Sequence, residues 1–128
     1  MKKIILLLSC IFVMTSMSAQ TSFQELTLEK ALEQAKVENK YVFIDCYTSW
    51  CGPCSAELIN VRKAYDLLKD KGLKVVAIST DEKEKDWLKA VNAKKMNDFV
   101  NLRDSKRVLW NLFNRNSIPF ILLIDPEG

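Results

Sequence analysis

The spacing of hydrophobic and polar residues changes several times along the chain, and each spacing predicts a helix or a strand. Residues after Thr27, a suitable N-cap, follow the i, i+3, i+4, i+7 spacing of an amphipathic helix: Leu28, Ala31, Leu32 and Ala35. Asn39 and Lys40 end this helix. Tyr41–Cys46 is a nearly continuous apolar run, which is typical of a strand buried on both faces of a sheet.

The alternation continues to the end of the sequence. A helix is expected from about Cys51, with Gly72 in the position of a C′ glycine. A buried strand is expected at 73–79, a helix at about 82–95 and a short strand at 99–102. A short helix at 105–113, an apolar strand at 120–124 and a turn at 125–128 follow. This order predicts an α/β layer fold with at least two parallel strands.

The N-terminus has the organisation of a secretory signal peptide. Lys2 and Lys3 form a basic segment, residues 4 to about 14 are apolar, and small residues end at Ala19. The sequence thus divides into a signal peptide, 1–19, and one domain, 20–128. Because the apolar run is shorter than the roughly 18–20 residues that cross a bilayer, no permanent membrane anchor is expected. Lipoprotein processing at Cys10 is the alternative.

Charge and residue usage exclude several classes of function. Removal of Lys2 and Lys3 lowers the net charge from +3 to +1, too little for an electrostatic nucleic-acid footprint. The charged runs at 81–86 and 94–95 are interpreted as solvated helix faces. The sequence contains no histidine, which excludes Cys–His and Ser–His nucleophiles and histidine-containing zinc or copper sites.

The segment Trp50-Cys51-Gly52-Pro53-Cys54 carries the candidate chemistry. Cysteines at this spacing can close and reopen a small disulfide ring, and a strand precedes them while a helix follows. This context predicts thiol–disulfide exchange. A structural pair of cysteines, or half of a metal site, is the alternative.

The predicted helix start assigns different roles to the two cysteines. Free backbone N–H groups and the helix dipole would stabilise a thiolate at Cys51, and Pro53 fits the first turn. Cys54 lies on the same helix face, shielded by the turn. Cys51 would therefore attack a partner disulfide, and Cys54 would resolve the mixed disulfide. Cys46 is interpreted as a buried bystander thiol.

These residues resemble the active site of the thioredoxin family, and the resemblance covers roughly residues 27–128. Asp45, six residues before Cys51, matches the buried aspartate of thioredoxins. Ile118-Pro119, before an apolar strand, matches the family's cis-proline. Glu57 and the turn at 125–128 resemble exported, TlpA-like thioredoxins. Ser55 departs from the family, which commonly has a basic residue there.

The resemblance implies a thioredoxin fold, with a central mixed sheet flanked by helices, and no bound cofactor or metal. It implies that Asp45 accepts the Cys54 proton, since burial should raise its pKa. Partner docking is expected at Trp50, Gly52, Pro53, Ile118 and Pro119. A complete fold adds a final strand and a closing helix after residue 124, so a fragment of a longer protein is expected. A partner or a second copy covering that edge is the alternative.

The expected function is reduction of disulfides in exported, periplasmic proteins, with electrons supplied by a membrane donor. Apocytochrome c is one client class suggested by the TlpA-like resemblance. Three other functions remain open at this point. They are a disulfide oxidase or isomerase, a thiol-based copper-handling module, and an interaction domain in which the disulfide is fixed.

Overall fold

The computed structural model describes residues 27–128, and its elements follow the predicted order. The helices are α1 (Leu28–Val37), α2 (Gly52–Leu68), α3 (Glu84–Ala93) and α4 (Val108–Leu112), with a short 3-10 helix at Lys69–Lys71. The strands are β1 (Tyr41–Tyr47), β2 (Leu73–Ser79), β3 (Val100–Arg103) and β4 (Phe120–Ile124). The predicted signal peptide and the lipoprotein alternative at Cys10 lie outside the described residues.

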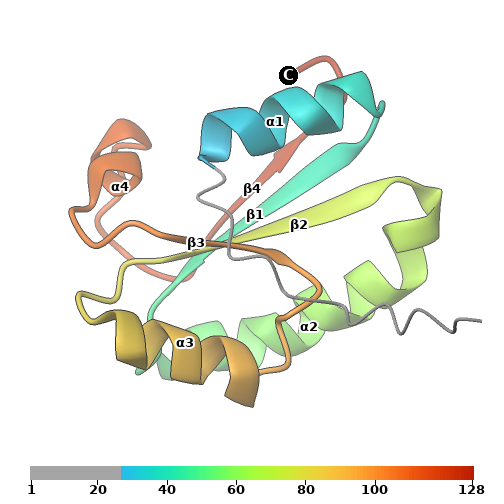
Figure 1. Cartoon of the computed structure of the whole chain (residues 1–128). Coiled ribbons are helices and arrows are strands. Elements are labelled where there is room, and N and C mark those ends of the chain that lie inside the picture. The colour runs from blue at the N-terminus through green and yellow to red at the C-terminus, as the bar shows by residue number, and fades with distance from the viewer. Residues whose placement is uncertain (1–26) are drawn as a thin grey trace, which may run out of the picture.

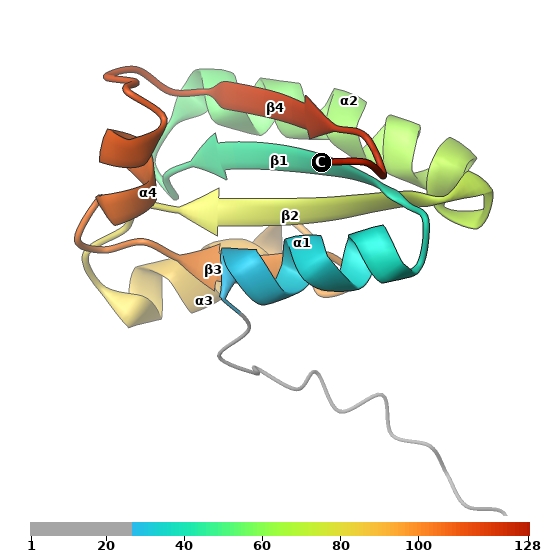
Figure 2. The ribbon, with the colours of Figure 1, turned by 90° about the horizontal axis from the view of Figure 1, so that it is seen from above.

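The four strands form one mixed sheet in the order β3-β2-β1-β4. β1, β2 and β3 are parallel, and β4 runs antiparallel to β1 (Figure 2). β1 is thus an inner strand, in which Asp45 pairs with Ala77 on one side and Ile121 on the other. Within residues 27–128, β4 is an edge strand, and the side chain of Leu123 on it is exposed.

Helices cover both faces of the sheet (Figure 1). α2 and α3 lie on one face, where their apolar residues form a core cluster with Tyr47, Val75 and Ala77. α1 and α4 lie on the other face, which has its own cluster around Ile44, Val76 and Ile78. Because side chains alternate along a strand, β1 contributes to both clusters.

Local hydrogen bonds explain where several elements begin and end. The Thr27 hydroxyl accepts from the Lys30 amide at 3.3 Å, as expected of an N-cap, and Gly72 has a φ of 98°. The last helix begins at Val108 rather than about residue 105, because Asp104 accepts hydrogen bonds from amides of its first turn. α3 stops at Ala93 because Lys94 caps it and Lys95 has a left-handed φ of 54°.

Among residues 27–128, no helix combines the length and the apolar character needed for a membrane crossing.

Candidate active site

A disulfide between Cys51 and Cys54 lies where β1 leads into α2. The two Cα atoms are 5.3 Å apart. Cys51 is the N-cap of α2, its Sγ accepts a hydrogen bond from the Cys54 amide at 3.1 Å, and Pro53 is in the first turn. Only 5% of Cys51 and 2% of Cys54 is exposed. The predicted strand–loop–helix context is confirmed, and both cysteines are almost inaccessible to solvent.

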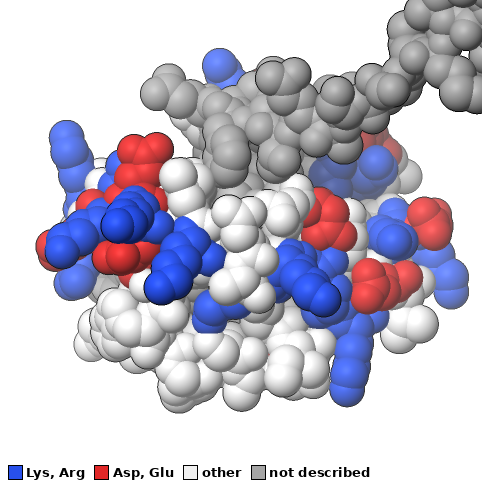
Figure 3. All heavy atoms as spheres, turned by 60° about the horizontal axis from the view of Figure 1, so that its bottom comes forward, with Lys and Arg blue, Asp and Glu red and all other residues white. Residues whose placement is uncertain are grey.

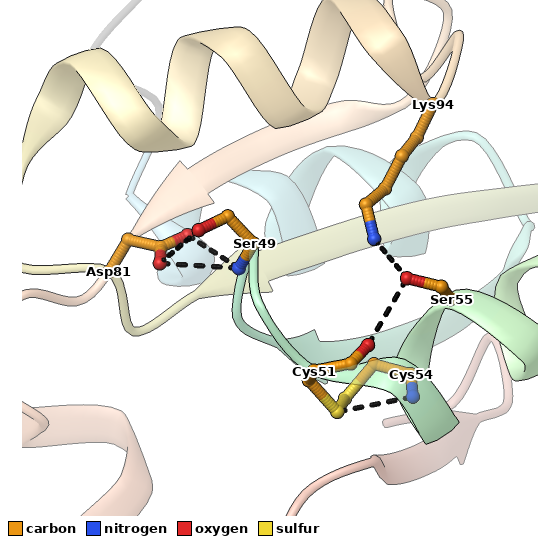
Figure 4. The surroundings of a disulfide bond; sticks show 6 residues. All are labelled: Ser49, Cys51, Cys54, Ser55, Asp81 and Lys94. Carbon is orange, nitrogen blue, oxygen red and sulfur yellow. Dashed lines mark hydrogen bonds between the residues drawn. A yellow bond between two sulfur atoms is a disulfide. The ribbon is translucent and has the colours of Figure 1, made fainter.

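Asp81 fixes the loop that precedes the disulfide. Its carboxylate accepts hydrogen bonds from the Ser49 amide at 2.9 Å and the Ser49 hydroxyl at 2.8 Å (Figure 4). It also accepts one from the Ser79 hydroxyl at 2.7 Å. The interpretation of residues 81–86 as a solvated helix face is therefore wrong for Asp81, which is 5% exposed and precedes α3. The missed signal was its place after β2, because the ends of adjacent parallel strands meet at one sheet edge.

Lys94, directly after α3, reaches the first turn of α2. Its ammonium donates a hydrogen bond to the Ser55 hydroxyl, which donates to the Cys51 carbonyl at 3.1 Å (Figure 4). Lys94 is half-buried and makes this contact at the surface, so the predicted solvated position holds only in part. The basic group that the family commonly carries after the second cysteine is absent at Ser55, and Lys94 brings a positive charge to that hydroxyl from α3.

Asp45 lies on the α2–α3 face of the sheet, the same face as the disulfide. Strand alternation places its side chain on the same face as Phe43 and Tyr47, which pack in the cluster that contains Cys51 and Cys54. It is 1% exposed, and its Oδ1 has no hydrogen-bond partner within the described residues.

Burial in this cluster raises the pKa of Asp45 to about 6. The nearby Glu57 carboxylate adds to the rise, whereas the positive charge of Lys94 opposes it. Asp45 therefore changes protonation close to neutral pH, the range that suits a general acid or base.

Cys46 is next to Asp45 in sequence but points to the other face of the sheet. It is 3% exposed in the cluster formed with α1 and α4, and it is a free thiol. Burial, with a smaller contribution from the Asp45 charge, raises its pKa to about 12. A thiol with this pKa is not a nucleophile at neutral pH, in keeping with the predicted bystander position.

The residues predicted to dock a partner differ in how exposed they are. Trp50 is 77% exposed, and Gly52 and Pro53 are exposed beside it. The Ile118-Pro119 peptide bond is cis, as the resemblance implied. Ile118 packs against the cluster that holds both cysteines, whereas Pro119 is exposed. The segment before β4 therefore reaches the disulfide layer from the far end of the sequence.

A mixed sheet of this topology, with a disulfide at the first turn of α2 and a cis-proline before β4, defines a thioredoxin fold with a redox-type CxxC site. Residues 39–128 match the family described as Thioredoxin-like, and the chain belongs to this family. Within the described residues, no group of three or more His, Cys, Asp or Glu side chains is arranged to hold a metal ion.

Individual relatives agree with this membership. The chain is 28% identical over 102 residues to the thiol-disulfide oxidoreductase ResA of Bacillus cereus, covering 77% of this chain and 57% of that protein. The chain thus spans little more than half the length of that relative.

Two solved structures are also similar. One is the thioredoxin domain of a thiol-disulfide oxidoreductase from Bacteroides vulgatus, with 33% identity, a TM-score of 0.67 and coverage of 76% of this chain and 69% of that one. The other is a thiol:disulfide interchange protein from Bacteroides sp., with 35% identity, a TM-score of 0.65 and coverage of 76% and 64%.

Proposed function

We propose that this chain is a thiol–disulfide oxidoreductase that reduces disulfides in partner proteins. The observation that carries the proposal is the Cys51–Cys54 disulfide at the first turn of α2, with the Cys54 amide directed at the Cys51 sulfur. In the reduced protein the same amide and the helix N-terminus would stabilise the Cys51 thiolate. The names of the relatives in Bacillus and Bacteroides agree with this chemistry.

The reaction proceeds through two sulfur exchanges. The Cys51 thiolate attacks one sulfur of the partner disulfide, forms a mixed disulfide and expels the other partner sulfur as a thiolate, which takes a proton from water. Cys54 then loses its proton and attacks the Cys51 sulfur, which releases the second partner thiolate. The partner gains two electrons, and the Cys51–Cys54 pair is oxidised by two electrons.

Asp45 is the proposed acceptor of the Cys54 proton. Its carboxylate faces the layer that contains Cys54, has one unpaired oxygen within the described residues, and has its pKa raised to about 6. At neutral pH it is mostly ionised, so it can take the proton, through a water molecule, during resolution.

The N-terminal sequence and the resemblance supply the cellular setting of the proposal. Export through a signal peptide cleaved after Ala19 would place the domain in the periplasm, with clients docking along Trp50, Ile118 and Pro119. A membrane electron donor would re-reduce the disulfide. Apocytochrome c is the client class to test first, on the TlpA-like resemblance alone.

The redox equilibrium of the full chain tests the direction of electron transfer between the Cys51–Cys54 pair and its partners. The protein carrying Cys46→Ala is equilibrated with glutathione and dithiothreitol buffers, and the Cys51–Cys54 state is read by thiol alkylation. A potential near the about −270 mV of thioredoxin supports a reductase. A potential near the about −120 mV of strong oxidants assigns the chain to disulfide formation or isomerisation instead.

Client capture tests exchange in the cell. The Cys54→Ser variant removes the resolving thiol, so partners should remain bound to Cys51 as mixed disulfides that dithiothreitol releases. The Cys51→Ser/Cys54→Ser double variant is the matched control. If both variants retain the same proteins, the disulfide is a fixed structural bond and the proposed activity is wrong.

A further inference from the structure

A shallow pocket lies beside the disulfide, between the Trp50 loop and α3. Its volume is about 280 Å³, with Ser49 and Trp50 on one side. Residues of α3 from Asp86 onward, and Lys94 directly after α3, form the other side. Since Trp50 directly precedes Cys51, a polypeptide bound through a mixed disulfide at Cys51 would pass close to this pocket. It is distinct from the segment around the cis-proline, which reaches the disulfide from β4.

Several interactions fix the walls of the pocket. Asp81 holds the Ser49 side of the loop through both the amide and the hydroxyl. α3 is anchored to the sheet by Val91, which is fully buried. Lys94 is tied through Ser55 to the carbonyl of Cys51 (Figure 4). The pocket is therefore preformed, and little ordering is needed when a ligand enters it.

The lining combines an apolar surface with an excess of positive charge. Trp50 presents an exposed indole, and the small Ala90 and Ala93 side chains leave space opposite it. Lys89 and Lys94 contribute two positive charges, against one negative charge from Asp86. Lys89 makes no salt bridge within residues 27–128, so its ammonium is available to a ligand.

The wider surface on this side of the molecule carries charges of both signs. Figure 3 shows the side of the molecule that carries α2 and α3, where positive and negative side chains are interleaved, with uncharged surface below them. A local charge excess beside an exposed aromatic side chain is suited to selecting one partner segment over another.

We infer that this pocket binds the residues that flank the reactive cysteine of the client, an apolar side chain against Trp50 and a neighbouring carboxylate against Lys89. The inference rests on the proposed function and narrows its substrate class to disulfide-bearing polypeptides with an acidic and apolar sequence beside the cysteine. Clients with basic residues at the same place would be disfavoured, because their charge would meet two lysines.

The charge part of the inference is tested with two peptide disulfides that differ only in Asp-Phe or Lys-Phe beside the cysteine. The second-order rate of their reduction by the full-length reduced protein is measured at low salt. The acidic probe should react faster by on the order of fivefold, as expected for one exposed charge pair, and less so at high salt. Lys89→Glu should reverse this preference, whereas Lys95→Glu, outside the pocket, should preserve it.

The apolar part is tested by filling the pocket. Ala93→Phe places a large side chain opposite Trp50, so a probe with Phe beside its cysteine should lose its rate advantage over one with Gly. Asn92→Phe is the matched control, because Asn92 is also exposed on α3 and does not line the pocket. This variant should retain the advantage.

Reduction of a small disulfide separates this inference from the proposed function. If the wild-type protein exchanges with oxidised glutathione but reduces all peptide probes at one rate, the pocket does not select clients and the inference is wrong. The inference is also wrong if Lys89→Glu and Lys95→Glu change the peptide preference equally. If the protein exchanges with no disulfide at all, the proposed function itself fails.

Discussion

Asp45 and Cys46 are neighbouring buried residues of β1 that point to opposite faces of the sheet, and the two faces surround them with different groups. Asp45 points toward α2 and α3, shares its layer with the disulfide and has its pKa raised to about 6. Cys46 points toward α1 and α4, packs among aliphatic side chains and has its pKa raised to about 12. Both residues are almost inaccessible to solvent, at 1% and 3% exposure.

The difference shows that burial alone does not make a residue functional. Desolvation raises both pKa values, but only the pKa of Asp45 moves toward neutral pH, because a carboxylic acid starts below it and a thiol starts above it. Among residues 27–128, the disulfide and a buried carboxylate with an unpaired oxygen both lie on the α2–α3 face. The buried carboxylate with an unpaired oxygen thus lies on the face where exchange would occur, whereas both oxygens of the buried Asp104 beside α4 accept hydrogen bonds.

The sharpest test of this contrast replaces one cysteine on each side. Cys51→Ser should reduce disulfide exchange to the rate of buffer alone, because a serine hydroxyl is not a nucleophile toward disulfides. Cys46→Ala should leave the exchange rate unchanged and cost about 1 kcal/mol of unfolding free energy, for the small cavity left in the α1–α4 face. Exchange kinetics with oxidised glutathione and denaturant unfolding measure the two effects. A large loss of rate in Cys46→Ala would break the contrast.

Asp45→Asn is expected to give the next largest effect. Removing the proton acceptor should slow resolution of a mixed disulfide by about 100-fold, the lower end of general-base contributions. The rate in the wild-type protein should rise with pH through about 6 as Asp45 ionises, and this rise should disappear in the variant. Single-turnover release of a labelled client peptide from Cys51 measures the step.

Asp45→Asn should also change how the stability of the protein depends on pH. The folded protein holds the Asp45 proton up to about pH 6, whereas the unfolded chain releases it near 3.8. Stability associated with this group is therefore present below pH 3.8 and is lost as the pH rises to about 6, by on the order of 3 kcal/mol. Relative to wild type, Asp45→Asn should gain stability across that range in denaturant titrations. Parallel profiles from pH 4 to 7 would show that the pKa of Asp45 is not raised.

Two buried aspartates provide a matched pair on the two sides of the sheet. Asp81 holds the loop before the disulfide, while Asp104 holds the first turn of α4. Replacing either by Ala should cost about 1–3 kcal/mol, because donors lose their acceptor. Only Asp81→Ala should also slow exchange, by about tenfold, less than the ~100-fold that an ångström of misplacement can cause. Equal effects on exchange would mean that the loop contact serves stability alone.

Glu57→Gln should give the smallest effect and sharpen the description of the Asp45 environment. Loss of the Glu57 charge should lower the pKa of Asp45, and Lys94→Met should raise it, since these two charges act on Asp45 in opposite directions. Titration of the Asp45 carboxyl carbon by NMR measures both shifts in the oxidised protein. Shifts of the same sign in the two variants would contradict this arrangement.

Secondary structure and the redox centre were available from local sequence because their causes are local. Apolar periodicity predicted the element order, and the apolar run at β1 required a strand buried on both faces. The strand at 73–79 was predicted with the bounds that β2 has. Cysteines three residues apart at a helix start must lie near one another, so the Cys51–Cys54 pair did not depend on the rest of the fold.

Tertiary structure decided which distant residues support that centre. From the sequence, Asp81 and Lys94 are interpreted as ordinary surface charges, because their neighbours along the chain do not reveal which residues they contact in the folded protein. The parallel arrangement of β1 and β2 brings Asp81 to Ser49, and the end of α3 brings Lys94 to Ser55. Charge and hydrogen bonding act through space over a few ångströms, whereas the sequence records only neighbours along the chain.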